Sequence, residues 1–485
     1  MKKTLAIITA LMIGSLTSLF AQNEIDALRY SRLTPTGTAR YVAVGGAFGA
    51  LGADFTTLSH NPAGIGVYKS SEITFTPSIF QGRSQSDYFD LTKENDRYNF
   101  NIGNAGFVLV TNPGGKSTEA GWKNFQFGFG VNRLANFNNR ISIEGFNESS
   151  SYLTPYVNEA NANHYSLDEL DNFGSGLAYD VFLMGFDSAA NEYFIDMPNG
   201  GVLQSKYIST TGSINEMVFS VGGNYNDRVY LGATIGVPFL RYDETAVYRE
   251  VDTENRNAYL NNFERIDELT TTGNGVNLKA GIIVRAADWF RIGAAIETPT
   301  FYTLSDEYSS TMKANFDTLF DPQRKKVEGF YEYELNTPFK AMFGVGLVLG
   351  KAGLISADYE YIDYTAARLR SSDYDFQEEN DAIRNDYMKA HNIRLGTEWR
   401  YGMIAFRGGY GISANPYKEN TNSVMTSYSL GIGLRGSNFF ADLGWMNSNM
   451  DDEYYLYNAP QNADQAFAKT KIESSSFLLT LGLKF

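Results

Sequence analysis

The 485-residue chain carries 55 acidic and 40 basic side chains, a formal net charge of −15, and it contains no cysteine. Such an acidic chain lacks the basic surface that nucleic-acid binding requires, so no nucleic-acid partner is expected. Without cysteine, disulfides and thiolate metal sites are excluded. The 32 Tyr, 34 Phe and 46 Gly against only 12 Pro are typical of many strands joined by loops in one large β-protein.

The N-terminus has the pattern of a secretory signal peptide. Two lysines precede an apolar run from Leu5 to Leu19, and Ala21 offers a cleavage site. A segment of this kind directs a chain out of the cytoplasm and is then removed. We therefore expect residues 1–21 to be a signal peptide.

Residues 38–68 form an apolar, glycine-rich stretch with neither helical nor strand periodicity. Glycine at this density weakens helix and strand alike, so packing from outside must hold the segment. Asp54 can cap a short helix, and Asn61-Pro62 predicts a compact turn in which Gly64 is free to adopt positive φ. We expect residues 22–70 to be enclosed by the rest of the protein. The residues that mark the motif are Gly45, Gly46, Phe48, Asp54, Asn61, Pro62, Ala63 and Gly64.

This series of Gly-Gly-Ala-Phe, Asp and Asn-Pro-Ala-Gly resembles the N-terminal plug of the outer-membrane hydrophobic-compound channels of the fatty-acid and toluene transporter (OmpP1/FadL/TodX) type, over about thirty residues. The resemblance implies a barrel plugged by residues 22–70 that takes up hydrophobic small molecules, such as long-chain fatty acids, without chemistry. It also implies capture by extracellular loops and exit sideways through the barrel wall. Pro77, Gly103 or Gly106 could supply the bulge for such an exit, because proline and glycine interrupt a strand ladder.

From residue 71 onward the hydrophobic pattern has a period of two, as in residues 125–131 and 428–434. The pattern predicts an all-β, transmembrane, up-and-down antiparallel barrel of about fourteen strands, an even number as in bacterial single-chain barrels. The predicted strands lie near residues 71–82, 98–110, 122–133, 213–225, 228–240, 275–286, 289–299, 338–350, 353–364, 391–401, 403–412, 426–436, 438–447 and 474–485.

The connections between these strands alternate in length, which is typical of a barrel with short periplasmic turns and long extracellular loops. Short connections include Asn226-Asp227 and Gly436-Ser437, and the last strand ends in Phe485. That terminal aromatic residue resembles the signal read by the outer-membrane assembly machinery, so we expect the barrel to face outer-membrane lipid. The long loops of the barrel domain, residues 71–485, are expected at 134–212, 241–274, 300–337, 365–390 and 448–473.

Three of the long loops contain apolar residues at helical spacing, and we expect each to carry an amphipathic helix. In residues 134–212, Ser166 and Glu169 have the spacing of a capping box before an apolar run. The helices either pack on each other as a cap or present a capture surface for hydrophobic solutes. The candidate capture surface consists of Tyr259, Phe263, Ile266, Met312, Phe316 and Leu319.

Charged residues on the polar face of the strands are candidates for ligand contact inside the barrel. Pairing across the Tyr401-Gly402 turn predicts that Arg394 lies diagonally near Arg407. These arginines either form a network with carboxylates that holds the plug or bind the carboxylate of a ligand. The candidate lumen contacts are Arg394, Arg407, Phe48 and Leu51.

The three histidines, His60, His164 and His391, have no metal-ligand or nucleophile spacing. We therefore expect no enzyme, no metal site and no cofactor. A second hypothesis from another functional class is an interaction protein, in which the barrel is a subunit or adaptor of an outer-membrane secretion or assembly complex and the plug is purely structural. Long loops suit both hypotheses.

Overall fold

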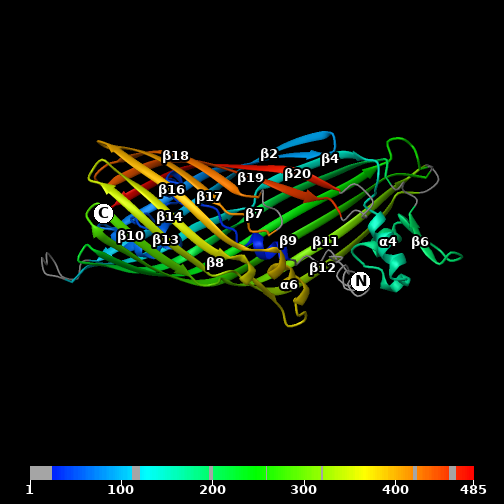
Figure 1. The fold of residues 1–485 in the computed structure, drawn as a ribbon, viewed down its shortest axis with the longest axis horizontal. Helices are drawn as coiled ribbons and strands as arrows, with labels where there is room; N and C mark the ends of the chain where they lie inside the picture. Colours follow the sequence, from blue (N-terminus) through cyan, green and yellow to red (C-terminus); the bar gives the residue numbers. More distant parts are fainter. Residues whose placement is uncertain are drawn as a thin grey trace, which may run out of the picture.

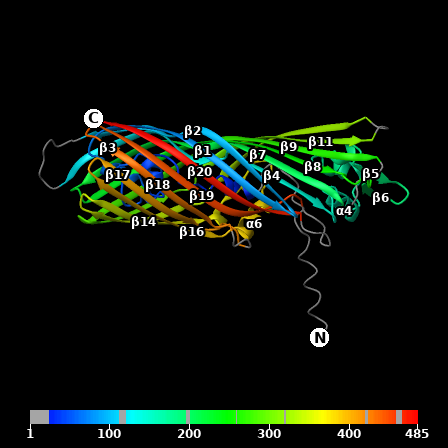
Figure 2. The same cartoon turned by 90° about the horizontal axis from the view of Figure 1, so that it is seen from above.

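The computed structural model is dominated by one closed antiparallel barrel (Figures 1 and 2). Its main sheet has eighteen strand segments, and four of the barrel strands are each made of two consecutive segments, so the wall has fourteen strands. The predicted signal peptide lies outside the described residues. The structure describes residues 24–111, 121–195, 200–257, 259–317, 321–418, 423–457 and 466–485.

Successive barrel strands pair along the chain, and β1 closes the barrel by pairing with β20. All fourteen predicted strands are confirmed, since each overlaps one barrel strand. The barrel strands are β1 (Glu72–Tyr88), β2 (Leu91–Thr111), β3 (Trp122–Asn136) with β4 (Asn139–Asn147), β7 (Val202–Tyr225), β8 (Val229–Val251), β9 (Leu260–Ala287), β10 (Phe290–Glu297) with β11 (Phe301–Phe316), β12 (Gln323–Asn336) with β13 (Lys340–Leu349), β14 (Gly353–Asp363) with β15 (Arg368–Arg370), β16 (Lys389–Tyr401), β17 (Ile404–Ser413), β18 (Met425–Arg435), β19 (Phe439–Tyr455) and β20 (Phe467–Lys484).

The two ends of the barrel differ. The short connections lie at one end with the C-terminus, at the left of Figure 1, and we call this the turn end. At the opposite end, the lid end, helices and a small hairpin cap the barrel. They are α4 (Thr154–Ala162), η2 (Leu167–Glu169), α5 (Ser175–Asp180), β5 (Met184–Asp187) and β6 (Glu192–Ile195).

The outward face of the wall is apolar over only part of its height. On β8, Leu231, Ile235 and Phe239 are exposed, whereas Arg241 and Arg249 follow on the same face toward the lid end. A membrane-spanning strand needs about 9–11 residues, and β8 has 23. The barrel therefore continues well past its apolar band at the lid end. Among the described residues, no helix is both long and apolar enough to cross a membrane.

The predicted long loops at 241–274 and 300–337, and the helices expected in them, are wrong. Strands β8, β9, β11 and β12 continue through most of both ranges. Outside the apolar band the outward face of a strand can be polar. The alternation of apolar and polar residues that predicted the strands within the band is therefore weaker there. Inward-facing apolar residues such as Phe263 then mimic helical spacing.

Residues 134–212 do contain helices, although not the long helix expected after the capping pattern. Ser166 and Glu169 form a capping box on the short helix η2. Helix α5 ends at Asp180 within the predicted apolar run, and β5 begins at Met184. The range 365–390 contains a further helix, α6 (Gln377–Asp386).

The lid is held by an apolar core and one buried polar network. Leu153, Leu177, Val181 and their neighbours pack against Tyr248 and Phe263 of the wall. The Glu250 carboxylate accepts hydrogen bonds from Ser151 Oγ at 2.6 Å and Gln204 Nε2 at 2.8 Å, and burial raises the pKa of this group. These contacts fix the lid on the ends of β7 and β8.

The segment before β1 lies inside the barrel, where its residues pack against wall strands on all sides. It forms four short helices: α1 (Glu24–Arg29), α2 (Ala39–Ala43), α3 (Thr57–His60) and η1 (Pro62–Val67). We call residues 24–70 the plug.

The opposite placement of the two ends can be tested with an epitope tag. A tag inserted after Gly436, in a turn-end connection, should be inaccessible to antibody on intact cells. A tag after Asp373, in the exposed connection between β15 and β16, should be accessible, because short turns face the periplasm in membrane barrels. Labelling of intact and lysed cells measures both, and the reverse pattern would contradict the orientation.

Candidate functional site

The glycine-rich part of the plug is tied into a compact unit by Asp54. Its carboxylate accepts hydrogen bonds from Thr38 Oγ1 at 2.7 and 2.8 Å and from the Thr56 backbone N–H at 3.0 Å. Thr38 in turn accepts from the Tyr41 N–H and caps helix α2. The residues that directly precede α2 and α3 are therefore held together.

The Asn61-Pro62 turn begins a 3-10 helix rather than a simple turn. The Asn61 side chain accepts from the Ala63 N–H at 3.1 Å and donates to the Gly49 carbonyl at 2.6 Å. Gly64 lies within that helix, so the positive φ predicted for it is wrong. Glycine is needed there for close packing, since a Cβ would lie 2.5 Å from Thr57 Oγ1.

Two glycines of the motif adopt the left-handed conformation where the plug meets the wall. Gly45 has φ of 67° and Gly46 has φ of 76°. A Cβ at Gly45 would approach the Tyr410 backbone nitrogen to 3.1 Å. Because only glycine adopts this conformation without strain, the motif fixes how closely the plug approaches β17.

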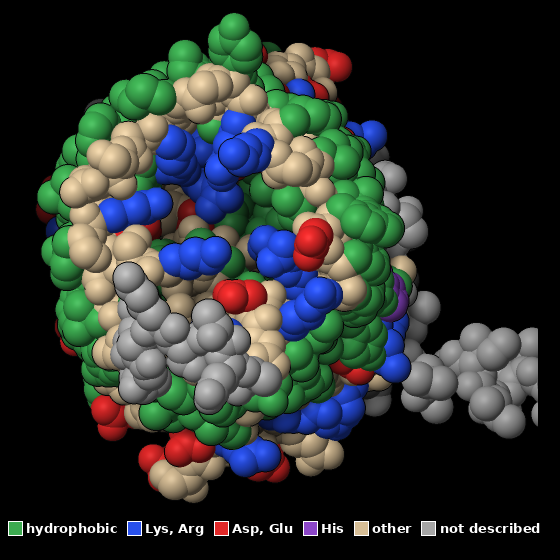
Figure 3. Space-filling model, turned by 90° about the vertical axis from the view of Figure 1, so that its left-hand side faces the viewer, with side chains coloured by type: hydrophobic (Ala, Val, Ile, Leu, Met, Phe, Trp, Pro, Cys, Tyr) green, Lys and Arg blue, Asp and Glu red, His purple; other side chains and the backbone are tan. Residues whose placement is uncertain are grey.

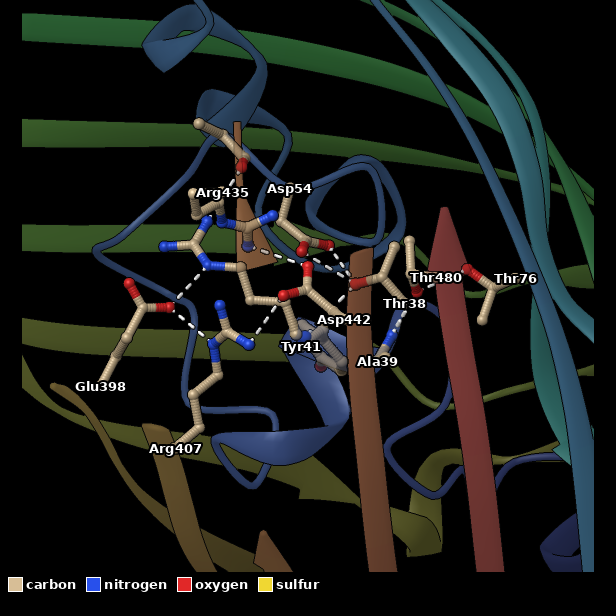
Figure 4. A network of polar contacts seen from close by, with 12 residues as sticks. Thr38, Ala39, Tyr41, Asp54, Thr76, Glu398, Arg407, Arg435, Asp442 and Thr480 are labelled. Atoms are coloured by element: carbon tan, nitrogen blue, oxygen red, sulfur yellow. Dashed lines mark hydrogen bonds and ion pairs between the residues drawn. The ribbon is translucent and has the colours of Figure 1, made fainter. Parts of the chain in front are cut away.

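An ionic cluster near the turn end joins the plug to the wall. Glu398 of β16 accepts from plug Arg40 at 2.9 Å and from Arg407 of β17 at 2.7 Å, and Arg407 also donates to Asp442 of β19 at 2.8 Å. Figure 4 shows these wall side chains facing Thr38 and Asp54. We call Arg40, Glu398, Arg400, Arg407, Arg435 and Asp442 the ionic cluster.

A second contact anchors the start of α2. The Ala39 N–H donates to Thr480 Oγ1 of β20 at 2.7 Å, and that hydroxyl lies 2.8 Å from Thr76 Oγ1 of β1. The plug is thus fixed to both sides of the closure between the first and last strands (Figure 4).

The predicted proximity of Arg394 and Arg407 is wrong. Residue pairing places Arg407 opposite Glu398, whereas Arg394 lies opposite Gly411, four residues further along β16 and roughly 13 Å away at 3.3 Å per residue. Arg394 donates to Glu360 of β14 at 2.8 Å. The two arginines therefore belong to separate ion pairs.

The four candidate lumen contacts do not meet in one place. Arg407 is in the ionic cluster and Leu51 lines a cavity at the turn end, whereas Arg394 lines a separate pocket deeper in the lumen. Phe48 is buried in the plug beneath the Arg40 guanidinium, which lies 5.0 Å from its ring centroid.

The candidate capture residues are also divided. Phe263 and Met312 are fully buried in the lid core, and Phe316 packs against that core. Tyr259 is exposed and Ile266 is half-buried. Leu319 lies outside the described residues.

One side of the barrel contains a break in strand pairing, between β2 and β3, that was not predicted from the sequence. Strand β2 pairs with β1 from Leu91 to Val108, but it pairs with β3 only from Asn104 to Thr111. Within the described strands, residues 91–103 of β2 have no ladder to residues 133–147 of β3 and β4, which pair instead with β7. We call these two stretches the seam.

The seam is bridged by side chains instead of backbone bonds. Asn136 donates to Asn99 Oδ1 at 3.4 Å, and Arg133 donates to the Ile102 carbonyl at 3.3 Å. The carbonyl of Arg140 on β4 accepts from Ser84 of β1 at 2.6 Å, so β4 passes against the inward face of the β1–β2 hairpin. The sequence signal for this region is its row of asparagines, from Asn95, Asn99, Asn101 and Asn104 to Asn132, Asn136, Asn138 and Asn139.

A bulge marks the turn-end limit of the seam. The register of β1 and β2 shifts between Thr76 and Pro77, which face Asn104 and Ile102, so that Gly103 is the extra residue. Two of the three positions suggested for a bulge, Pro77 and Gly103, therefore lie at one. A Cβ at Gly103 would lie 2.7 Å from the Gly37 carbonyl, so the plug touches the bulge from inside.

Two cavities lie beside the plug. A pocket of about 70 Å³ is bounded by plug residues 33–36, by Arg133 and Leu134 of the seam, and by Arg394. A larger cavity of about 780 Å³ opens at the turn end, where Figure 3 shows the hollow surrounded by Lys and Arg side chains. Among the described residues, no three carboxylate or imidazole groups are placed to share a metal ion.

Three solved structures resemble the chain over nearly their whole length. A Pseudomonas aeruginosa FadL homologue has a TM-score of 0.56 at 11% identity and is matched over 93% of this chain and 99% of that one. The Pseudomonas putida toluene transporter TodX gives 0.55 at 10% identity, with coverage of 93% and 99%. The Ralstonia pickettii toluene transporter TbuX gives 0.52 at 13% identity, with coverage of 93% and 98%.

The chain has the fold of these hydrophobic-compound channels. The structural likeness confirms the fold that the plug motif suggested, although identity near one residue in ten does not determine a substrate. No protein-family model matches the sequence, and no curated protein matches it.

The ionic cluster can be tested through the exposure of Arg40. Glu398→Gln removes the carboxylate that three arginines share, and breaking a buried ion pair typically costs about 3–5 kcal/mol. We expect the plug to detach and trypsin to cleave the folded barrel after Arg40, as followed by mass spectrometry.

The matched control is Glu360→Gln, which removes the partner of Arg394 and leaves the contacts of Arg40 intact. Equal cleavage after Arg40 in the two variants and in the native protein would show that the cluster does not hold the plug.

Proposed function

We propose that the protein is a passive channel in the bacterial outer membrane that carries hydrophobic small molecules from its lumen through the seam into the membrane. An apolar solute is slowed by the polar outer leaflet and not by hydrocarbon, so the protein needs only to shield the solute past that layer. No covalent step is required.

The observation that carries this proposal is the missing ladder at the seam. Separating two paired strands breaks a series of backbone hydrogen bonds, whereas opening the seam breaks side-chain contacts. These include the hydrogen bonds of Asn136 to Asn99 and of Arg133 to the Ile102 carbonyl, and the ion pair of Lys93 with Glu144 at 2.6 Å. The lumen pocket lies directly inside, behind plug residues 33–36. The pocket already borders the seam at Arg133 and Leu134, and displacement of that short segment would enlarge it there.

The same segment couples the plug to the seam. Thr36 donates through its hydroxyl to the Arg133 carbonyl, and the adjacent Gly37 contacts the bulge at Gly103. A solute that enters the pocket must displace residues 33–36, and this displacement removes an inner contact of the seam. Entry and exit are in this way linked without any added energy source.

Capture is assigned to the lid. Several apolar side chains are exposed at the lid end, including Phe182 at 65% and Leu167 at 49% on the lid itself and Tyr259 at 55% beside it, before β9. Long-chain fatty acids are the solute class that we favour from the plug motif, and the names of the two toluene transporters make small aromatic compounds the alternative.

A reversible cross-link across the seam tests the route. The chain has no native cysteine, so Asn99→Cys and Asn136→Cys can be joined by a short bis-thiosulfonate linker. We expect cross-linked protein to remain folded and to lose uptake of radiolabelled oleate or toluene, measured in cells that lack their own transporter for the solute. Reductant should restore uptake, and the solute that responds identifies the substrate class.

The control pair is Asn447→Cys with Ser475→Cys, which joins two side chains that already hydrogen-bond at 3.0 Å across the intact β19–β20 ladder. Its cross-link should leave uptake unchanged. Uptake at the native rate through the cross-linked seam would contradict the proposed route.

A further inference from the structure

The cavity at the turn end is lined by more basic than acidic side chains, although the chain as a whole is acidic, with a net charge of −15. Four carboxylates line it: Asp54, Glu72, Glu398 and Asp442. Six basic side chains line it: Arg40, Arg291, Lys351, Arg400, Arg435 and Lys484.

The carboxylates are already committed to partners within the protein. Glu398 is shared by Arg40, Arg400 and Arg407, and Asp442 is shared by Arg407 and Arg435. Asp54 is hydrogen-bonded to Thr38 and Thr56 within the plug. Glu72 lies 3.9 Å from Lys484. None of them remains to neutralise the other cations of the cavity.

Two cations of the cavity have no carboxylate within 4.0 Å in the described part of the chain, namely Arg291 and Lys351. Arg291 donates only to the Leu51 carbonyl, at 3.0 Å, and its buried Nε has no partner among the described residues. Arg285 lies directly opposite Arg291 in the β9–β10 ladder. Arg285 is ion-paired with Asp288 at 3.2 Å, so Arg291 is the member of this facing pair that has no carboxylate partner in the described residues. Like charges facing each other across a ladder are destabilising, and an anion bound at Arg291 would relieve that repulsion.

The apolar residues that line the cavity indicate that a ligand would also have an apolar part. Val67, Val348 and Leu354 are half-buried and line the same cavity. A volume of about 780 Å³ is within the range of small-molecule sites. Basic side chains beside apolar ones match a molecule with one anionic head and a small apolar body.

We propose that this cavity is a binding site for organic anions, with Arg291 and Lys351 receiving a carboxylate or phosphate group and Val67, Val348 and Leu354 contacting the apolar body. The site goes beyond the proposed channel function and does not depend on it, because it lies on the other side of the plug from the lumen pocket. Under the proposed orientation it faces the periplasm, and its ligands arrive from there.

Fluorine NMR on the full-length protein in neutral detergent can test the site. The probe is para-trifluoromethylbenzoate, and the matched neutral compound is para-trifluoromethylbenzyl alcohol. We expect saturable binding of the benzoate and much weaker binding of the alcohol. The double variant Arg291→Gln, Lys351→Gln should weaken benzoate binding on the order of tenfold.

Lys351→Gln alone changes an exposed turn residue and keeps the test valid if the double variant fails to fold, with an expected loss of about threefold. The matched control is Lys69→Gln, an exposed lysine that does not line the cavity, and it should leave binding unchanged. Equal binding of benzoate and alcohol, or equal affinity in all variants, would overturn the proposal. Competition by inorganic phosphate at the same concentration as benzoate would overturn the part that concerns the apolar body.

Discussion

Backbone hydrogen bonding in hydrocarbon is the constraint on which this structure depends. Within a membrane every N–H and C=O must be paired by the protein itself, and a closed antiparallel barrel does so through the ladders between its strands. In this barrel one junction lacks part of its ladder. Here that junction is the seam, where β2 leaves β3 at Asn104. The overlap of β4 with the β1–β2 hairpin, the bridging asparagines and the plug segment at Thr36 all supply contacts that a regular ladder would otherwise provide.

The plug follows from a related constraint. Its many glycines prevent it from being stable alone, so it is stabilised by the wall through a few strong contacts and close backbone approaches. Arg40 with Glu398 fixes its turn-end side, and Ala39 with Thr480 fixes it to the barrel closure. Near the seam the contact is through Thr36 and Gly37, without an ion pair in the described residues. The strongest contacts of the plug therefore lie at the turn end and at the barrel closure. The contacts near the seam, where the plug would have to move, are weaker.

Sequence reasoning identified those parts of the fold that lipid constrains. Alternation of apolar and polar residues located all fourteen strands, and Pro77 and Gly103 indicated the bulge, because both features follow from local rules of strand geometry. Beyond the apolar band the alternation fades, so the lid-end parts of strands such as β9 are predicted as loops with helices. The prediction for Arg394 and Arg407 failed for another reason. The β16–β17 register differs by two residues from the one that a Tyr401-Gly402 turn implies, and this moves Arg407 roughly 7 Å farther from Arg394 along the strand. Contacts between the plug and the wall join residues that are hundreds of positions apart, so no local pattern could reveal Glu398 as the partner of Arg40.

An exit through the side of the barrel has an electrical consequence. If solutes leave at the seam, the plug never has to vacate the axis of the barrel, and Arg40 can remain bound to Glu398 during every passage. No continuous aqueous column then joins the two ends of the protein. A solute that used this route would cross the wall without opening a path for ions or other water-soluble molecules.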